Sequence, residues 1–400
     1  MSSPRRWWSP QDGLAGPARR VADVLRAHGP RTRSELIHLT HLSRVTVLAA
    51  LTELGAHGLI DRQVVIRERE PGRGRAAETV ALGRAAGLAA GIEIGRQRVC
   101  VIVQEMGGGA HAVGSTRLDR DAEPEKAFHV AAQLLDEVLI ELGGDRQSLI
   151  CACVGISAPV TFDGQIGSQI LGERWRRDRP VESLGRWLDC PVILDNDANL
   201  GALAEYTLGA VGEAAGRGTA TVRCLLYVKA ATGIGGGIVI DGEVFRGASG
   251  TAGEIGHITL DPHGDPCRCG NRGCVELIAG GGRLLLLART AHADLTDLAD
   301  LVRRANARDS VCRRLIADAG RQIGTALGAV VGLYNPDAIV VGGALAEAKE
   351  LIPKIAQALE DAVMPAAFGA VRSIVPARLG VEASAWGGIM RIRRTADLPS

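Results

Sequence analysis

The stretch GEIGHITLDPHGDPCRCGNRGCVE, residues 253–276, gathers one histidine and three cysteines into a short span. His257, Cys267, Cys269 and Cys274 follow the spacing H-x9-C-x-C-x4-C and supply one imidazole and three thiolates. These groups match a closed tetrahedral zinc site, in which four protein ligands leave no position for a catalytic water. The pattern predicts a structural zinc knuckle over residues 257–276. The alternative is a chance cluster of free thiol and imidazole groups.

The same stretch resembles the signature of a known family. The run GEIGH followed by CRCGNRGCVE is similar to the signature of the ROK family, whose members are sugar-responsive repressors and sugar kinases on the actin-like ATPase fold. The resemblance implies an α/β region of two lobes with a sugar bound between them. Together with the matching pieces described below, it covers nearly the whole chain.

Charge is distributed unevenly along the 400 residues. The net charge is +1, yet the first 80 residues hold 13 Arg against 8 Asp or Glu, which makes this end +5 and leaves −4 for the rest. A basic amino end is expected where a protein meets phosphate. The chain has no apolar run of the roughly 20 residues that cross a bilayer, and its start has no signal-peptide core. We expect a cytoplasmic protein without a membrane partner.

The amino end is predicted to form a winged helix-turn-helix over residues 17–83, after a mobile tail at 1–16. Apolar residues recur at helical spacing from Ala18 to Ala27, and Thr32 with Glu35 forms a capping box for a second helix. Ser43 is placed to cap a third helix after a tight turn. Two strands, from Leu59 to Ile66 and from Glu78 to Leu82, are predicted to form the wing.

This arrangement suits a recognition helix in the major groove and a wing in the minor groove. Side chains able to contact bases or phosphates lie at the start of the third helix and at the wing tip. The predicted DNA contacts are Ser43, Arg44, Thr46, Arg73 and Arg75. A small helical interaction domain is the alternative. The region also resembles the winged helix of ROK regulators, with His41 in place of the usual turn glycine.

The first lobe is predicted to span residues 88–195 and to open on a buried strand over 88–95. In ROK kinases this strand leads into a D-x-G-G-T turn that holds magnesium and phosphate. Here the corresponding residues run from Glu93 to Gln97 and place Arg96 where a glycine would let the backbone approach phosphate. We therefore expect neither ATP nor magnesium as a cofactor.

The second lobe is predicted over residues 196–382, with a final helix over 383–395 returning to the first lobe. It opens with Asn196 and Asp197, directly after the strand Val192–Leu194. The carboxyl end of a strand is a common ligand site, although both residues could instead be turn and cap residues. By resemblance to the family's N-D-A-N motif, Asn196 would bind sugar. Asp197 would be a kinase's general base or, in a regulator, an acceptor for a sugar hydroxyl.

The resemblance implies a wider set of sugar contacts, which are Asn196, Asp197, Glu254, His257 and Glu276. Residues 225–240 resemble a second phosphate-contacting turn through Gly233 and Gly235, although plain hairpin geometry explains these glycines equally well.

We predict a sugar-responsive transcriptional regulator, a repressor rather than an enzyme. Its expected partners are a double-stranded DNA operator and a sugar or sugar phosphate. We expect a homodimer, because paired half-sites need two recognition helices, with a tetramer also open. One alternative is a zinc-containing, ATP-dependent sugar kinase of the same family. Another is a regulator controlled by a protein partner.

Overall fold

The computed structural model describes residues 14, 16–65, 77–119, 122–167, 175, 179–212 and 222–395. Most of the predicted tail at 1–16, and both predicted wing-tip residues, Arg73 and Arg75, lie outside these ranges. Among the described residues, no helix combines the length and apolar character needed to cross a membrane.

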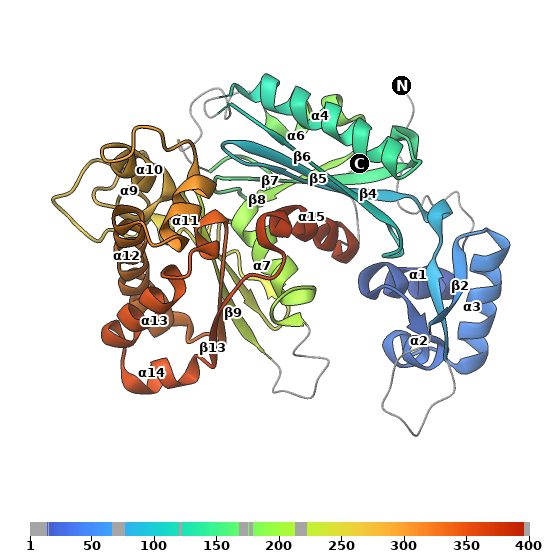
Figure 1. Ribbon diagram of the computed structural model, residues 1–400. Coiled ribbons are helices and arrows are strands. Elements are labelled where there is room, and N and C mark those ends of the chain that lie inside the picture. The colour runs from blue at the N-terminus through green and yellow to red at the C-terminus, as the bar shows by residue number, and fades with distance from the viewer. Residues whose placement is uncertain are drawn as a thin grey trace.

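The N-terminal region, residues 16–82, packs three helices against a small sheet (Figure 1). Its elements are α1 (Gly16–His28), β1 (Arg31–Thr32), α2 (Arg33–Thr40), α3 (Arg44–Ala56), β2 (Ile60–Val65) and β3 (Ala77–Leu82). The predicted capping box is confirmed, because Thr32 and Glu35 bond reciprocally at the start of α2. His41 ends α2 with a φ of 56°, the left-handed conformation in which glycine is usual. The sheet has the order β1-β3-β2, so β1 extends the predicted two-stranded wing.

The first lobe is a five-stranded sheet with helices on both faces. Its elements are β4 (Leu88–Ile94), β5 (Arg98–Glu105), β6 (His111–Arg117), α4 (Pro124–Glu141), β7 (Leu149–Ile156), α6 (Pro180–Leu188) and β8 (Val192–Asn196). The strand order is β6-β5-β4-β7-β8, antiparallel among the first three and parallel from β4 through β7 to β8. Parallel strands need a crossover connection, and α4 and α6 lie in those connections.

The second lobe repeats this strand order. Its elements are α7 (Asp197–Thr207), β9 (Cys224–Ala230), β10 (Ile234–Ile240), β11 (Glu243–Val244), the 3₁₀ turn η5 (Ile255–His257), α9 (Val275–Ala279), α10 (Gly281–Arg289), α11 (Leu298–Asn306), α12 (Ser310–Tyr334), β12 (Ala338–Gly342), α13 (Leu351–Ala362), α14 (Pro365–Ala370) and β13 (Ser373–Pro376). The order β11-β10-β9-β12-β13 again sets an antiparallel meander beside two parallel additions. The two lobes therefore share one topology, and their polar strand ends face a common cleft.

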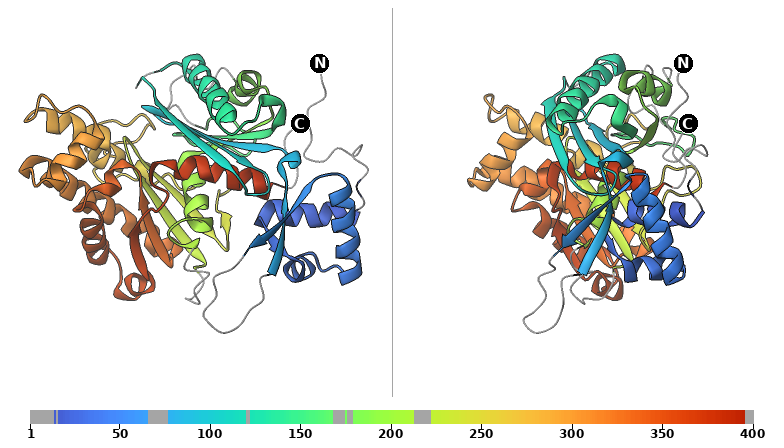
Figure 2. Two further views of the ribbon diagram at one scale, coloured as in Figure 1. Left: turned by 45° about the vertical axis from the view of Figure 1, so that its right-hand side comes forward. Right: turned by 90° about the vertical axis from the view of Figure 1, so that its right-hand side faces the viewer.

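Helix α15 (Ala383–Arg394) lies at the centre of the molecule, between the lobes (Figure 1). It packs on β4 and β7 of the first sheet and against α7, which covers the second sheet. Contact with α7 is close, because a Cβ on Gly387 would lie 1.9 Å from the Leu200 carbonyl oxygen. One buried cluster continues from α15 into the N-terminal region and joins Ile389 and Ile392 to Val21 and Leu25. Figure 2 shows the N-terminal region at the end of this helix.

Candidate functional site

A cleft of about 270 Å³ separates the two lobes. Strand ends and loops from both sheets line it, together with the first residues of α15. The five predicted sugar contacts all lie on its wall, namely Asn196, Asp197, Glu254, His257 and Glu276. A concave site rich in hydroxyl-binding groups has the character of a small-ligand pocket.

Asn196 and Asp197 lie where β8 passes into α7. The Asn196 side-chain oxygen accepts hydrogen bonds from the backbone N–H groups of Ala198 and Asn199, and its Nδ2 donates to the Ala158 carbonyl. Asn196 therefore caps α7, as the alternative interpretation of this turn held, and has one amide hydrogen left for a ligand. Asp197 is nearly buried, and its Oδ2 accepts a hydrogen bond of 2.5 Å from Ser157 Oγ.

Glu254 and Glu276 line the cleft from either end of the cysteine-rich loop. Burial raises the pKa of Glu254 to about 7, and the charges of Asp197 and Glu276 add to the effect. Glu276 Oε2 instead accepts a hydrogen bond of 3.2 Å from the Ile234 N–H in the glycine-rich hairpin. A Cβ on Gly233 would lie 2.3 Å from this oxygen, so the carboxylate would have to move if any other residue stood there. Here, then, one backbone amide of the predicted phosphate-contacting hairpin, that of Ile234, serves an anion of the protein itself.

Gly235, the other glycine of the predicted phosphate turn, lies against a helix instead. A Cβ on Gly235 would meet Ala198 Cβ of α7 at 3.2 Å. The turn from Glu93 to Gln97 also lines the cleft. Arg96 reaches across the cleft and places its guanidinium 3.5 Å from Glu276 Oε1. Its long side chain thus spans the space in which a bare backbone would approach phosphate.

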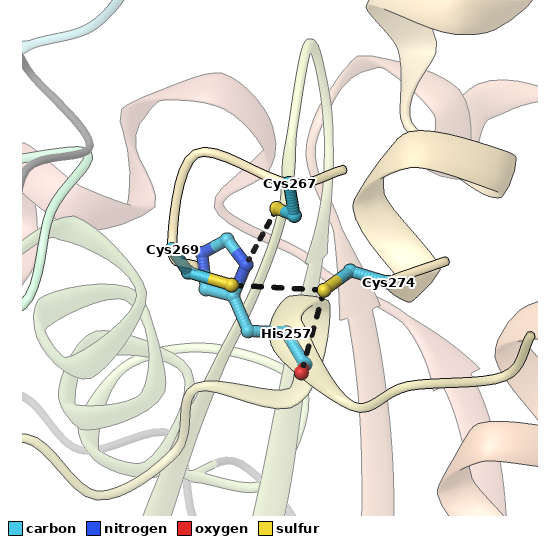
Figure 3. A group of neighbouring side chains, drawn as sticks. All are labelled: His257, Cys267, Cys269 and Cys274. Carbon is cyan, nitrogen blue, oxygen red and sulfur yellow. Dashed lines mark hydrogen bonds between the residues drawn. The ribbon is translucent and has the colours of Figure 1, made fainter. Parts of the chain in front are cut away.

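His257 and the three cysteines converge at the edge of the cleft (Figure 3). Cys267 Sγ lies 3.6 Å from His257 Nδ1, and Cys269 Sγ lies 3.7 Å from Cys274 Sγ. Tetrahedral zinc with bonds of about 2.3 Å to sulfur and about 2.0 Å to nitrogen sets sulfur–sulfur distances of about 3.8 Å and sulfur–nitrogen distances of about 3.5 Å. The four groups could therefore hold zinc with little movement. Burial lowers the pKa of His257 and favours the neutral imidazole that binds metal.

Three polar residues in or beside the cleft were missed by the sequence analysis. Lys229 lies on β9 and donates to Asp197 Oδ2 at 2.7 Å. Ser157 contacts the same oxygen. Arg246 forms a two-pronged ion pair with the buried Asp195, at 2.7 and 2.6 Å. A signal for Lys229 was present, because it is one of only four lysines in the chain and stands inside an apolar strand.

Helix α15 connects this cleft to the N-terminal region. Its first residues, Ala383 and Ser384, line the cleft, and Ser384 Oγ donates to the Asp197 carbonyl oxygen at 2.8 Å. At its other end the buried Arg26 of α1 donates to the carbonyl oxygens of Ile392 and Arg393 at 3.2 and 2.9 Å. A movement of α15 at the cleft would thus reach α1 directly.

The predicted DNA contacts that the structure describes lie at the start of α3. Ser43 caps this helix by accepting from the Thr46 N–H at 3.1 Å, and the two hydroxyls lie 2.7 Å apart. Arg44 is exposed, whereas Val47, Leu51 and Leu54 turn toward the core. Since capping occupies Ser43 and Thr46, Arg44 is the predicted contact that remains free to reach outward from this turn.

The chain belongs to the ROK family, whose model matches residues 89–394. It is 25% identical over 370 residues to a xylose repressor of Bacillus subtilis, covering 92% of each chain. It is also 33% identical over 254 residues to a glucokinase of Halalkalibacterium halodurans, covering 59% of this chain and 74% of the glucokinase. A crystal structure of a ROK family transcriptional regulator, a homolog of the Escherichia coli Mlc protein, superposes with a TM-score of 0.71 at 23% identity. That match covers 94% of this chain and 95% of the other.

Proposed function

We propose that the chain is a sugar-responsive transcriptional repressor that binds an operator through its N-terminal region and a sugar in the cleft. The observation that carries this proposal is the continuous path of α15 between the two sites. A sugar kinase needs no such link to a basic helical region. Alignment with a xylose repressor over 92% of both chains supports the same conclusion.

In this proposal the N-terminal region is a winged helix-turn-helix and α3 is its recognition helix. The exposed first turn of α3 carries Arg44 and has no acidic residue, which suits an approach to DNA phosphates and base edges. Two copies of the chain would present two such helices to paired half-sites, so we propose a homodimer as the binding form.

The proposed effector is a sugar or sugar phosphate held by Asp197, Glu254 and Glu276. Sugar hydroxyls donate and accept hydrogen bonds, and these carboxyl groups offer acceptors on three sides of the cleft. A structural zinc on His257 and the three cysteines would fix the loop between Glu254 and Glu276. It would also leave His257 Nε2, 4.0 Å from Glu254, on the side of the ligand.

The proposed mechanism is a population shift between two arrangements of the lobes. A ligand that contacts both lobes favours their closed arrangement, and α15 then shifts the N-terminal regions relative to one another. Ligand can act in this way only through unequal affinity for the two arrangements.

The test uses the full chain and duplexes selected by it from a random DNA pool. Affinity for a selected duplex is measured by fluorescence anisotropy at fixed salt, with and without pentoses, hexoses, amino sugars and their phosphates. We expect at least one sugar to change the affinity about tenfold or more, within the usual range of allosteric coupling. Failure to select any duplex would refute DNA binding. Selection followed by no response to any sugar would refute the coupling alone.

A sugar kinase is the second candidate, favoured by the glucokinase relative and by Asp197 in the cleft. Release of ADP from magnesium ATP across the same sugars measures this activity directly. Turnover that disappears in Asp197→Asn would establish the kinase. Its absence from folded, metal-loaded protein would leave Asp197 as a binding residue.

A further inference from the structure

Lys229 places a positive charge in the floor of the cleft. It lies on β9, and only 14% of its side chain is exposed. Its ammonium group donates to Asp197 Oδ2 at 2.7 Å, to Glu93 Oε1 at 2.5 Å and to Ser384 Oγ at 3.4 Å. An ammonium group has three hydrogens to donate, so these three acceptors account for all of them.

The two carboxylates around Lys229 come from different parts of the fold and are both nearly buried. Glu93 lies on β4 of the first lobe with 7% of its side chain exposed, and its other oxygen, Oε2, accepts from Arg98 Nη2 at 3.0 Å. Asp197 begins α7 with 5% exposed. Two buried carboxylates that close to one another repel unless a cation lies between them. Burial by itself would lower the pKa of Lys229, but the charges of Asp197 and Glu93 outweigh it and raise the pKa. The ammonium group is therefore charged.

We propose that Lys229 is a built-in cation that occupies a latent divalent-cation site between Glu93 and Asp197. The two oxygens share one nitrogen as donor and so lie within about 5 Å of each other. Two oxygen ligands of Mg²⁺, at about 2.1 Å each, lie at most about 4.2 Å apart. A movement of about one ångström would let the same oxygens hold a metal ion once the ammonium is gone.

The presence of a lysine ammonium group in place of an exchangeable metal ion has two consequences for the cleft. The charge of Asp197 is balanced by the protein itself, so sugar binding in the cleft does not depend on a divalent ion. Lys229 also joins β9 of the second lobe to Glu93 of the first, which gives the closed arrangement a permanent ion pair. The inference goes beyond the proposed function, because it concerns the cation balance of the cleft and can be tested without DNA.

The experiment measures Mn²⁺ binding to the full chain by the loss of the free-ion electron paramagnetic resonance signal. Mn²⁺ is the suitable probe because it prefers carboxylate oxygen to the thiolates of the cysteine cluster. The wild type is compared with Lys229→Ala, which removes the cation, and with Lys229→Arg, which retains the charge. The double variant Lys229→Ala/Asp197→Asn removes one of the two carboxylates. Thermal unfolding of each protein is followed with and without Mn²⁺.

We expect Lys229→Ala to gain one Mn²⁺ site, at least tenfold tighter than any site in the wild type or in Lys229→Arg. The gained site should be lost in the double variant, and Mn²⁺ should raise the unfolding temperature of Lys229→Ala alone. If Lys229→Ala folds only when Mn²⁺ is present, the proposal is equally supported. It is overturned if Lys229→Ala binds Mn²⁺ no more tightly than the wild type, or remains unfolded at every Mn²⁺ concentration. Mn²⁺ binding by the wild type that Asp197→Asn abolishes would overturn it as well.

Discussion

Arg26 is the residue whose replacement tests the link between α15 and the N-terminal region most directly. Its side chain is 3% exposed, and its guanidinium donates to the carbonyl oxygens of Ile392, Arg393 and Thr395 at the end of α15. The Ile392 carbonyl also accepts from the Thr395 N–H, and all three carbonyls lie at the negative end of the helix dipole, where a cation is favourable. Arg26→Met would keep the length of the side chain and remove the donors.

The expected loss follows from the number and kind of these hydrogen bonds. A hydrogen bond from a charged donor contributes about 1.5–3 kcal/mol, and all three carbonyls accept from Nη1, whose two hydrogens make two such bonds, so the sum is about 3–6 kcal/mol. A relief of repulsion offsets part of this loss, because burial, Arg31 and Arg26 together lower the pKa of the neighbouring Arg393 to about 10. We therefore expect Arg26→Met to cost about 3 kcal/mol, near the lower end of the summed range.

Differential scanning calorimetry measures this loss. For a region of this size, about 3 kcal/mol corresponds to a decrease of roughly 10 °C or more, so the N-terminal region should unfold in a separate, earlier transition. Arg26→Lys serves as the control and should fall between the two proteins, because it keeps the charge with fewer donors. The variant should also bind DNA with a weaker response to sugar. A single transition at the wild-type temperature would refute the argument that Arg26 holds the two parts together.

Three further predictions concern the metal cluster, DNA and the stability of the cleft. Cys269→Ser should lower the zinc content, measured by metal analysis, and also the thermal stability, since metal binding and folding are linked. An unchanged zinc content would show that the cluster does not bind zinc. Arg44→Ala should weaken binding to a selected duplex by about 1–3 kcal/mol, and equal affinity would show that α3 does not read DNA. Arg246→Ala should cost about 3 kcal/mol in urea unfolding, at the lower end for a broken buried pair, because the buried Asp195 keeps only Arg391, 3.9 Å away, as a counter-charge. Arg223→Ala, which breaks an exposed ion pair, is the matched control for both arginine variants and should change neither DNA affinity nor stability by much. A loss of stability equal to that of Arg246→Ala would show that burial of the ion pair is not the cause.

Long apolar patterns in the sequence predicted their elements closely. The strand expected over 88–95 is β4, which ends at Ile94, and the helix expected over 383–395 is α15, which ends at Arg394. Such elements are buried on most sides, so their composition alone determines where they run.

No helix or strand was predicted from the sequence over residues 351–376. These residues form α13, α14 and β13, which stands at the edge of its sheet and, among the described strands, pairs with β12 alone. Helix α13 packs against α12, whose Gly324 brings the two backbones together, and a Cβ there would lie 2.4 Å from the Ile355 carbonyl oxygen. The short edge strand leaves a weak local pattern. Helix α13 does not, because its buried residues Leu351, Ile355 and Leu359 recur at helical spacing, a signal that was present in the sequence.

The sequence predicted which carboxylates line the cleft, but not which side chains form ion pairs with them. Each carboxylate could be assigned from its own motif, whereas its partner lies far away along the chain, as Glu276 does from Arg96 and Glu93 from Lys229. Side chains so distant in sequence meet only through the packing of two lobes, which a local pattern does not contain.

These ion pairs change how the altered turn between Glu93 and Gln97 is interpreted. Considered alone, glutamate for aspartate and arginine for glycine are two losses from a phosphate site. In the structure both residues form ion pairs across the cleft, Glu93 with Lys229 and Arg96 with Glu276. Both pairs join the first lobe to the second, and both direct charge at groups that a nucleotide and its metal would otherwise meet. Because each pair contributes more when water is excluded from the cleft, closure around an uncharged ligand would strengthen them without any phosphate present. The two residues that depart from the family's phosphate turn therefore supply contacts between the lobes that need no phosphate.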